Sequence, residues 1–588
     1  MPTEILTATF HIKLDGSDAS ETLMNNLVRL EVDRSLFMPG QFILEFVDVE
    51  LVWVDDTTLQ IGKEVEILAG ANPTNDPNAP AVVSLIKGEI TAVEPVFDND
   101  GVARVVVRGY DKLHRLQRGN RTATFLQMTD SDIISKVARE AGLSATVTAT
   151  STNHPYVIRD DISDYDFLTM LARRNGQVLH FDNGTLNVKA PDAFSFPEVT
   201  SKWLQDLLEF RPSLSISGQV NEVTVRGWDP KQKREVVGRA TTAKYAPNQI
   251  GHPNRGFQTA QSKISTGKFH LSEVIDTQDM AQKVADSAFS RMAANDLVGE
   301  GLCEGEPKIK PGAKIRLTGL GTNFSGTYLV TRARHFYSPD ESYRTEFWVG
   351  GMSSGTMANL LSPAKSNEPL RSGAFHGLIP AIVTNNSDPD DLGRVKVKFP
   401  SLSADDESFW ARVVSLGAGA DRGWNILPEV NDEVVVGFAN GDPNRPYLLG
   451  GVWNGMDKMP SKKADTVVGG KVEIREFKTR VGHVLRFTDG ESNAKIELLD
   501  KTGKNTLVID TKENKISIEA GGDISVKAGK NVTIEGGMNV SVKAGMNLEL
   551  KAVNVNVEAS AKFALKAAVV DIAGSGPVKI SGAMVMIN

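Results

Sequence analysis

The fold of this chain is decided by a repeat near its C-terminal end, and residues 521–550 show it most clearly: GGDISVKAGKNVTIEGGMNVSVKAGMNLEL. Pairs of apolar residues, separated by one residue, return here every eight residues: Ile524/Val526, Val532/Ile534, Val540/Val542 and Leu548/Leu550. Working outward, similar pairs begin at Ile496/Leu498 and continue to Val585/Ile587 at intervals of 7 to 11 residues. A nearly fixed interval of this kind is an internal repeat.

Each repeat predicts one short strand followed by a turn. Residues i and i+2 share a face on a strand but lie on different sides of a helix, and most members of the pairs are β-branched, which argues against a coiled coil. Gly529, Gly537 and Gly545 fall between the pairs, as corners of permissive backbone would require. A short strand cannot satisfy its own backbone groups, so other strands must stack on it. These come either from later turns of the same chain or from sister chains.

Length and composition limit the remaining possibilities. A chain of 588 residues predicts several domains, and its net charge of -8 argues against a general nucleic-acid or anionic-membrane binder. The one cysteine, Cys303, excludes an internal disulfide framework and suits a reducing cytosol. The sequence shows no signal-peptide pattern and no apolar run long enough to span a membrane. If the protein leaves the cell, we expect a route other than the Sec pathway.

The first 350 residues predict a mainly β region. Residues 1–110 are expected to form a small antiparallel barrel, because apolar and polar residues alternate in segments such as 6–14, LTATFHIKL. Strands resume in residues 211–350 and predict a second barrel, which a helix around residues 277–295 interrupts. The two barrels are the first two parts of a mainly β, multidomain fold.

Residues 111–210 predict an α/β insertion between the two barrels. The segment 129–132, TDSD, is a capping box ahead of an apolar helical pattern, and Gly142 marks the end of that helix. The segment 163–166, SDYD, starts a second helix, which ends at Gly176.

A linker and a compact barrel follow. Residues 351–373 are rich in Ser, Gly, Ala and Asn and are expected to be a linker. Residues 374–455 contain alternating strands and turns, among them GRVKVKFP at 393–400 and NGDPNRPY at 440–447, which suit a five-stranded OB barrel.

Several of these strings resemble the VgrG-type central spike proteins of contractile injection systems. The hub of that family resembles this chain at GYDKLH (109–114) and DYDFL (164–168), and its OB domain at NGDPNRPY (440–447). The octad repeat is similar to that of the trimeric, intertwined needles of contractile phage tail spikes. The resemblance implies hub β-barrels with an α/β insertion, an OB-fold collar and, over residues 456–588, a trimeric intertwined β-helix needle. The core of this needle would be the four pairs of the 521–550 repeat, in a rod of roughly 60 Å if each of twelve repeats advances one strand spacing.

The same resemblance implies partners and a place of action. The chain would be a homotrimer whose N-terminal hub binds inner tube and baseplate proteins, and whose needle meets a target membrane on firing. A PAAR-type tip protein would bind the last residues, Val585, Met586, Ile587 and Asn588. The protein would be cytoplasmic before assembly and then ejected with the particle. Type VI secretion, an extracellular phage-tail-like particle and a prophage tail all remain open, as does the cargo.

The sequence motifs for chemistry are weak, so we predict no catalytic, cofactor-binding or metal-binding residues and no enzyme activity. The glycine spacing at 321–326 fits a phosphate loop, but Thr327 stands where the lysine belongs. Residues 386–390 have calcium-loop spacing without the required Gly and Glu. His483 is the one histidine to watch for a site on a threefold axis. The OB aromatics, among them Trp410, could stack on a nucleic acid, but core and solvated roles are favoured in an acidic chain.

Two other functional classes stay open. A cell-wall hydrolase or effector-carrying spike would need a converging acid pair or triad, for which no motif is visible. A trimeric adhesin-like fibre would need a globular, aromatic-rich tip beyond the repeat.

Overall fold

The computed structural model describes residues 10–70, 82–99, 101–216, 218–245, 248–252, 268–272, 275–352, 377–400 and 406–587. The chain divides into two compact units, residues 1–458 and 459–588, and each is described by itself. The predicted linker lies almost wholly outside the described residues, and so does Asn588. Among the described residues, no helix is long and apolar enough to cross a membrane.

The first barrel is built from alternating strands, as predicted. Phe42, Leu44 and Phe46 are almost completely buried on one face of their strand, while the residues between them are only partly buried. Two short helices, α1 (Glu21–Asn25) and α2 (Val52–Asp55), lie in its connections. Its strands are β1 (Phe10–Leu14), β2 (Ser17–Asp18), β3 (Leu27–Ser35), β4 (Gln41–Val47), β5 (Glu64–Ala69), β6 (Val83–Phe97) and β7 (Ala103–Asp111).

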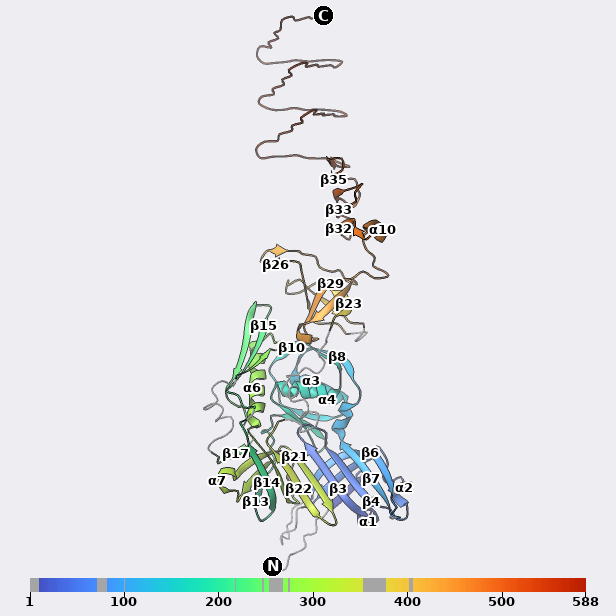
Figure 1. Ribbon diagram of the computed structural model, residues 1–588, viewed down its shortest axis with the longest axis vertical. Helices are drawn as coiled ribbons and strands as arrows, with labels where there is room; N and C mark the ends of the chain where they lie inside the picture. The colour runs from blue at the N-terminus through green and yellow to red at the C-terminus, as the bar shows by residue number, and fades with distance from the viewer. Residues whose placement is uncertain are drawn as a thin grey trace, which may run out of the picture. The chain divides into compact units, whose positions relative to one another are not determined.

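The second barrel continues the same sheet rather than forming a separate one. Strand β21 pairs antiparallel with β3 (Figure 1), so a single 14-stranded sheet runs through both predicted barrels. Eleven of its strands follow the order β14-β19-β22-β21-β3-β4-β7-β6-β5-β1-β2, while β17 and β20 branch from β21 and β13 pairs with β20. The short helix α7 (Gly321–Phe324) precedes β21. The strands of this half are β13 (Val199–Lys202), β14 (Leu207–Leu214), β17 (Asn248–Ile250), β19 (Leu297–Glu304), β20 (Lys314–Thr318), β21 (Gly326–Ser338) and β22 (Ser342–Val349).

The insertion contains both predicted helices, α3 (Asp130–Glu140) and α4 (Asp164–Arg174). The capping box at the start of α3 is present, because the Thr129 side chain accepts from the backbone N–H of Asp132 and the Asp132 carboxylate accepts in return. Gly142 and Gly176 follow the helices with positive φ, as helix ends require. The other elements are η1 (Lys112–Gln117), β8 (Arg121–Thr129), β9 (Ser144–Val147), β10 (Asn153–Ile162), β11 (Val178–Asp182) and β12 (Thr185–Lys189).

The predicted helix near residue 280 is α6 (Gln278–Ala294), and it packs on a three-stranded sheet of its own. That sheet has the order β16-β15-β18. One core joins valines of the sheet to the alanine-rich face of α6. The strands are β15 (Glu222–Asp229), β16 (Arg234–Ala240) and β18 (Lys268–Ser272).

The predicted OB fold is a closed five-stranded barrel with the order β23-β24-β25-β29-β28, and we call it the collar. Its core is small and aliphatic, with Val383, Val395 and Val434 fully buried. The elements are β23 (Ile379–Asn385), β24 (Arg394–Lys398), β25 (Ala411–Val413), β26 (Ala418–Gly419), β27 (Arg422–Gly423), β28 (Glu433–Phe438), η2 (Ala439–Gly441) and β29 (Pro446–Gly451).

The second unit begins with an antiparallel meander instead of the predicted turns of a β-helix. The pairs that start at Ile496, Leu507 and Ile516 lie in three consecutive hairpin-connected strands, where they face one another across the sheet. Residues 520–587, which we call the needle segment, contain no strand. The elements are α10 (Lys463–Thr466), β30 (Val467–Val468), β31 (Lys471–Val472), β32 (Ile474–Lys478), β33 (Val484–Thr488), β34 (Lys495–Leu499), β35 (Thr506–Asp510) and β36 (Lys515–Glu519).

Candidate assembly interface and interdomain pocket

The needle segment exposes the side chains that the sequence predicts as its core. Their exposed fractions lie between 55% and 77% in the single chain, although all of them are large and aliphatic. The eight residues are Ile524, Val526, Val532, Ile534, Val540, Val542, Leu548 and Leu550. The predicted tip residues Val585, Met586 and Ile587 are exposed as well. A monomer rarely exposes a contiguous apolar stripe of this size, so these residues require a covering surface.

The backbone of the needle segment has the same requirement. Figure 1 shows these residues following successive open turns rather than a paired sheet. Bends recur along the segment, at glycines in residues 521–545 and at other residues further on, and no ladder pairs residues 520–587 with any other described part of the chain. Backbone N–H and C=O groups need partners once they are buried. A second chain, rather than this one, must therefore supply the hydrogen bonds if the apolar stripe is covered.

The meander of strands β32 to β36 extends the apolar stripe. Cross-strand pairing aligns apolar side chains on one face, and most of them are exposed. On the other face Arg486 pairs with Glu476 at 2.8 Å between Nη2 and Oε2. The exposed members of the apolar face are Phe477, Leu485, Phe487, Leu498, Leu507, Ile516 and Ile518. The meander thus has one polar and one apolar face.

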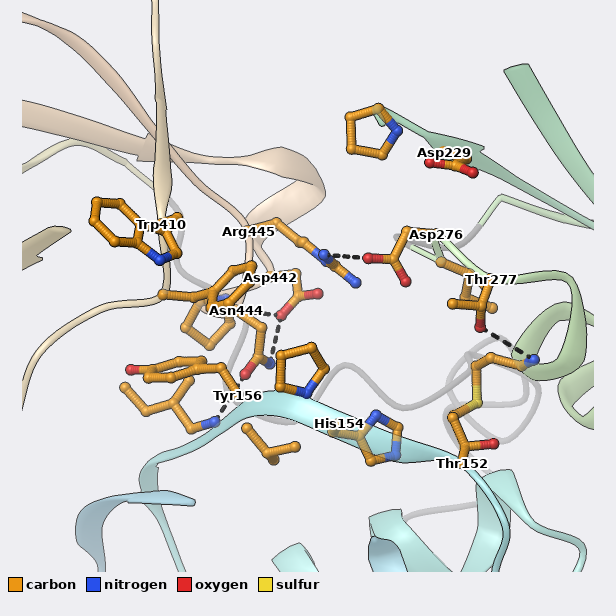
Figure 2. Close-up of a pocket in the computed structure, with 18 of the residues that line it drawn as sticks. Thr152, His154, Tyr156, Asp229, Asp276, Thr277, Trp410, Asp442, Asn444 and Arg445 are labelled. Carbon is orange, nitrogen blue, oxygen red and sulfur yellow. Dashed lines mark hydrogen bonds and ion pairs between the residues drawn. The ribbon is translucent and has the colours of Figure 1, made fainter. Parts of the chain in front are cut away.

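In the first unit, a pocket of about 680 Å³ lies where three parts meet (Figure 2). These are the insertion, the collar, and helix α6 with its three-stranded sheet, which we call the α6 module. Several contacts cross this boundary and hold the collar in place, and three of them line the pocket region. Asn444 accepts a hydrogen bond from the Ile158 backbone N–H at 2.7 Å, and the Tyr156 hydroxyl donates to the Glu407 carbonyl at 2.8 Å. The carboxylate of Asp276 pairs with Arg445 at 2.6 Å.

The pocket walls carry perturbed carboxyl groups. Burial, and then the charge of Asp161, raise the pKa of Asp160 to about 6. Behind the pocket, burial opposes ionisation of Asp130, but the charges of Arg174 and His154 outweigh burial and lower its pKa. Trp410 is flanked by the cationic groups of Arg394 and Lys396, at 5.9 and 5.6 Å from its ring. These groups form ion pairs and turns, and we see no nucleophile with a base and an oxyanion donor among them.

The residues considered for chemistry have structural roles. Cys303 is buried and its thiol donates to the Thr345 carbonyl at 3.5 Å, and burial raises its pKa well above the usual value. Asp388 of the calcium-like spacing binds Arg394 at 2.6 Å. The phosphate-loop spacing falls on the short helix α7. His483 lies in the turn before β33. No cluster of three or more potential metal ligands occurs within the part of the chain that the structure describes.

Comparison with protein families identifies the first unit. Residues 6–338, more than half of the chain, match the Alg8 N-terminal domain. The chain belongs to the Alg8 N-terminal domain family. Residues 379–453 match a second family, the type VI secretion system/phage-baseplate injector OB domain, which covers the collar barrel.

Curated VgrG proteins are similar to parts of the chain. VgrG3 of Vibrio cholerae, a type VI secretion system spike protein, is 30% identical over 28% of this chain and 18% of its own length. VgrG1a of Pseudomonas aeruginosa, another spike protein, is 32% identical over 21% of this chain and 19% of its own length. The actin cross-linking toxin VgrG1 of V. cholerae is 24% identical over 68% of this chain and 37% of its own length. The matches thus span less than two fifths of each relative.

Solved structures extend the likeness to the fold of most of the chain. VgrG chains of the Francisella PdpA–VgrG complex match with a TM-score of 0.53 in the lidded form and 0.52 in the half-lidded form, at 10% identity. They cover 88% and 87% of this chain, and 81% and 88% of those chains. Together with the OB family match, these findings confirm the predicted VgrG-type, mainly β, multidomain architecture.

Sequence reasoning missed the interdomain pocket. Asn444 and Arg445 belong to the string NGDPNRPY, which indicated an OB turn but gave no sign of its contacts with Ile158 and Asp276. These partners lie more than 150 residues away in the sequence, so no local pattern could have joined them.

Proposed function

We propose that this chain is the central spike of a contractile injection machine, joining the inner tube to a membrane-puncturing tip. The observation that carries the proposal is the needle segment, where a regular apolar stripe is exposed in a chain with an injector OB domain and a fold similar to that of the Francisella PdpA–VgrG structures. The spike delivers tip or cargo proteins by mechanical force, because sheath contraction drives a preassembled rod.

The proposed assembly is a homotrimer. Three interleaved chains would bury the eight core side chains of each needle segment and pair its backbone with the strands of the two sister chains. The rod would then have no long free strand edge along its sides. A single-chain solenoid is disfavoured, because the needle segment pairs no strand with itself or with the other described residues.

The proposed partners follow the two ends of the spike. Inner tube and baseplate proteins would bind the hub, and a PAAR-type tip protein would bind the apolar residues Val585, Met586 and Ile587, with Asn588 beside them. The Francisella structures contain a VgrG in complex with PdpA, so at least one protein of this fold assembles with another chain. On firing, the needle would meet the target membrane. The protein would assemble in the cytoplasm and leave with the particle.

We further propose that the chain acts without an enzymatic reaction of its own. The pocket of the first unit contains ion pairs and turn carboxylates rather than a catalytic arrangement. One relative is named a toxin, and that name belongs to a protein of which this chain covers 37%. A turnover assay on cell-wall substrate would overturn this part of the proposal if the purified chain hydrolysed it.

Counting the chain in intact particles tests the spike function. Contractile particles purified from cells that encode an affinity-tagged copy should contain three tagged chains per particle by quantitative mass spectrometry. Cells lacking the gene should yield no loaded, full-length particles. Normal particles without the chain, or tagged chain found only outside particles, would contradict the proposal.

A further inference from the structure

Two arginines of the hub lie near each other, and neither pairs with a carboxylate of the described residues. Arg173 lies in the last turn of α4 and Arg291 in the last turn of α6, and these two helices contact each other. The Ser287 hydroxyl of α6 donates to the Arg173 backbone carbonyl at 2.6 Å, which fixes the two helix ends side by side. The Lys244–Tyr245 turn also lies against α6. The Lys244 backbone N–H donates to the Ser290 hydroxyl at 2.9 Å, which places Tyr245 near Arg291.

The side chain of Arg291 is partly buried, and it has no hydrogen bond or ion pair among the described residues. Its Nε atom is inaccessible to solvent and has no hydrogen-bond partner. Neither Arg173 nor Arg291 forms a side-chain hydrogen bond or ion pair with any residue in the described ranges. Burial, and then the charge of Arg173, lower the pKa of Arg291 to about 10. Burial also lowers the pKa of Arg173. Guanidinium groups stay protonated in proteins at neutral pH. Burying a charge without a partner is costly, and a like charge beside it adds to the cost.

Neither of two nearby acids pairs with these arginines. Asp286 pairs with Lys244 at 3.3 Å and accepts from Gln282. Burial raises the pKa of Tyr245 above its usual value, Arg291 lowers it, and Asp192 raises it. Asp192 pairs with neither arginine. The negative ends of the two helix dipoles favour positive charge here, yet they do not supply the directed acceptors that a guanidinium fork binds.

We infer that Arg173 and Arg291 form a binding site for a phosphate-type oxyanion at the junction of α4, α6 and the Lys244–Tyr245 turn. Two guanidinium groups match the charge of a phosphate near neutral pH, and their planar forks suit its oxygens. An anion bound here would neutralise the repulsion and lock the α6 module to the insertion.

Inorganic phosphate is the probe for this site. Calorimetric titration of the full chain should show saturable binding, and the unfolding midpoint should rise by a few degrees against chloride at equal ionic strength. Comparison with glycerol 3-phosphate identifies the source: weaker binding of the ester assigns the site to the free ion, and equal or tighter binding assigns it to a phosphate ester.

Matched variants decide the role of the arginines. Arg291→Gln should weaken phosphate binding at least tenfold and should raise the unfolding midpoint in phosphate-free buffer, because it removes one of two repelling charges. Arg173→Gln, at a partly exposed position, should also weaken phosphate binding. It is the substitute test if Arg291→Gln does not fold. Arg139→Gln, on the exposed side of α3, should leave both quantities unchanged. No saturable response in the native chain, or the same affinity in Arg291→Gln and Arg173→Gln as in the native chain, would overturn the inference.

Discussion

A single charge placed in the needle core provides a sharp test of assembly. Val540 is 56% exposed in the isolated chain. In a strand of the assembled needle, the next residue, Ser541, would point to the opposite face. If chains interleave, Val540→Asp puts three carboxylates into the core at one level, whereas Ser541→Asp puts them in solvent. In an isolated chain the two changes would be nearly equivalent.

The size of the effect follows from burial. Fully burying a valine contributes about 1.5–3 kcal/mol, so covering the exposed part of Val540 contributes about 1 kcal/mol per chain. An uncompensated buried carboxylate costs several kcal/mol more. Over three chains, Val540→Asp should therefore destabilise the assembly by on the order of 10 kcal/mol. Ser541→Asp should stay within about 0.5 kcal/mol.

The assay is thermal unfolding combined with light scattering over a range of protein concentrations. Val540→Asp should dissociate the assembly or lower its unfolding midpoint by about 10 °C or more. Ser541→Asp should match the native protein. If Val540→Asp kept the native mass and midpoint, the apolar repeat would not be a buried core and the proposed needle would be refuted.

Two further predictions concern the first unit. The pKa of Asp160 is raised to about 6, so the folded state prefers the neutral acid; this stability is fully present below the unfolded pKa near 3.8 and is lost as pH rises through 6. Asp160→Asn should therefore raise the free energy of unfolding at pH 8 by up to about 3 kcal/mol, and should change it little at pH 3. A pH-independent effect would show that the carboxyl charge is not involved. Gly238 packs so close to α6 that an added Cβ would lie 2.0 Å from the Ala281 carbonyl oxygen, so Gly238→Ala should destabilise the hub by about 1–3 kcal/mol or more in denaturant unfolding. Gly450→Ala, whose Cβ would meet nothing within 4 Å, is the control, and equal effects of the two substitutions would contradict the packing argument.

Local sequence patterns were sufficient to predict the elements that short-range interactions stabilise. The caps at Thr129 and Ser163 use side chains within three residues of the backbone groups that they bind. The OB strings are likewise contiguous, so the strands of the collar could be predicted without tertiary information, whereas residues 520–587 of the octad repeat contain no strand in the single chain.

Contacts between distant segments could not be predicted in this way. The joining of both barrels into one sheet rests on the pairing of β21 with β3, where Arg332 binds Asp33 across almost 300 residues of sequence. The pocket is another case, because its ion pair between Asp276 and Arg445 follows from the collar's position.

The meander shows a limit of the repeat itself. Apolar residues at i and i+2 suit a hairpin strand and a β-helix turn equally well, so the pairs alone cannot separate them. The connection decides: between β34 and β35, the Asp500 carboxylate accepts from the Thr502 backbone N–H at 3.1 Å and from the Asn505 side chain at 2.8 Å, which closes a hairpin turn. Beyond residue 520 the connections are short glycine corners without such a carboxylate cage.

The most direct test of the central claim is the mass of the purified chain in solution, by light scattering after size exclusion, compared with a variant that ends at residue 465. The proposed spike predicts a full-length mass of about three times 63.7 kDa and a smaller or unstable assembly after truncation. A monomer in both cases would contradict the intertwined needle and remove the mechanical basis of the proposed function.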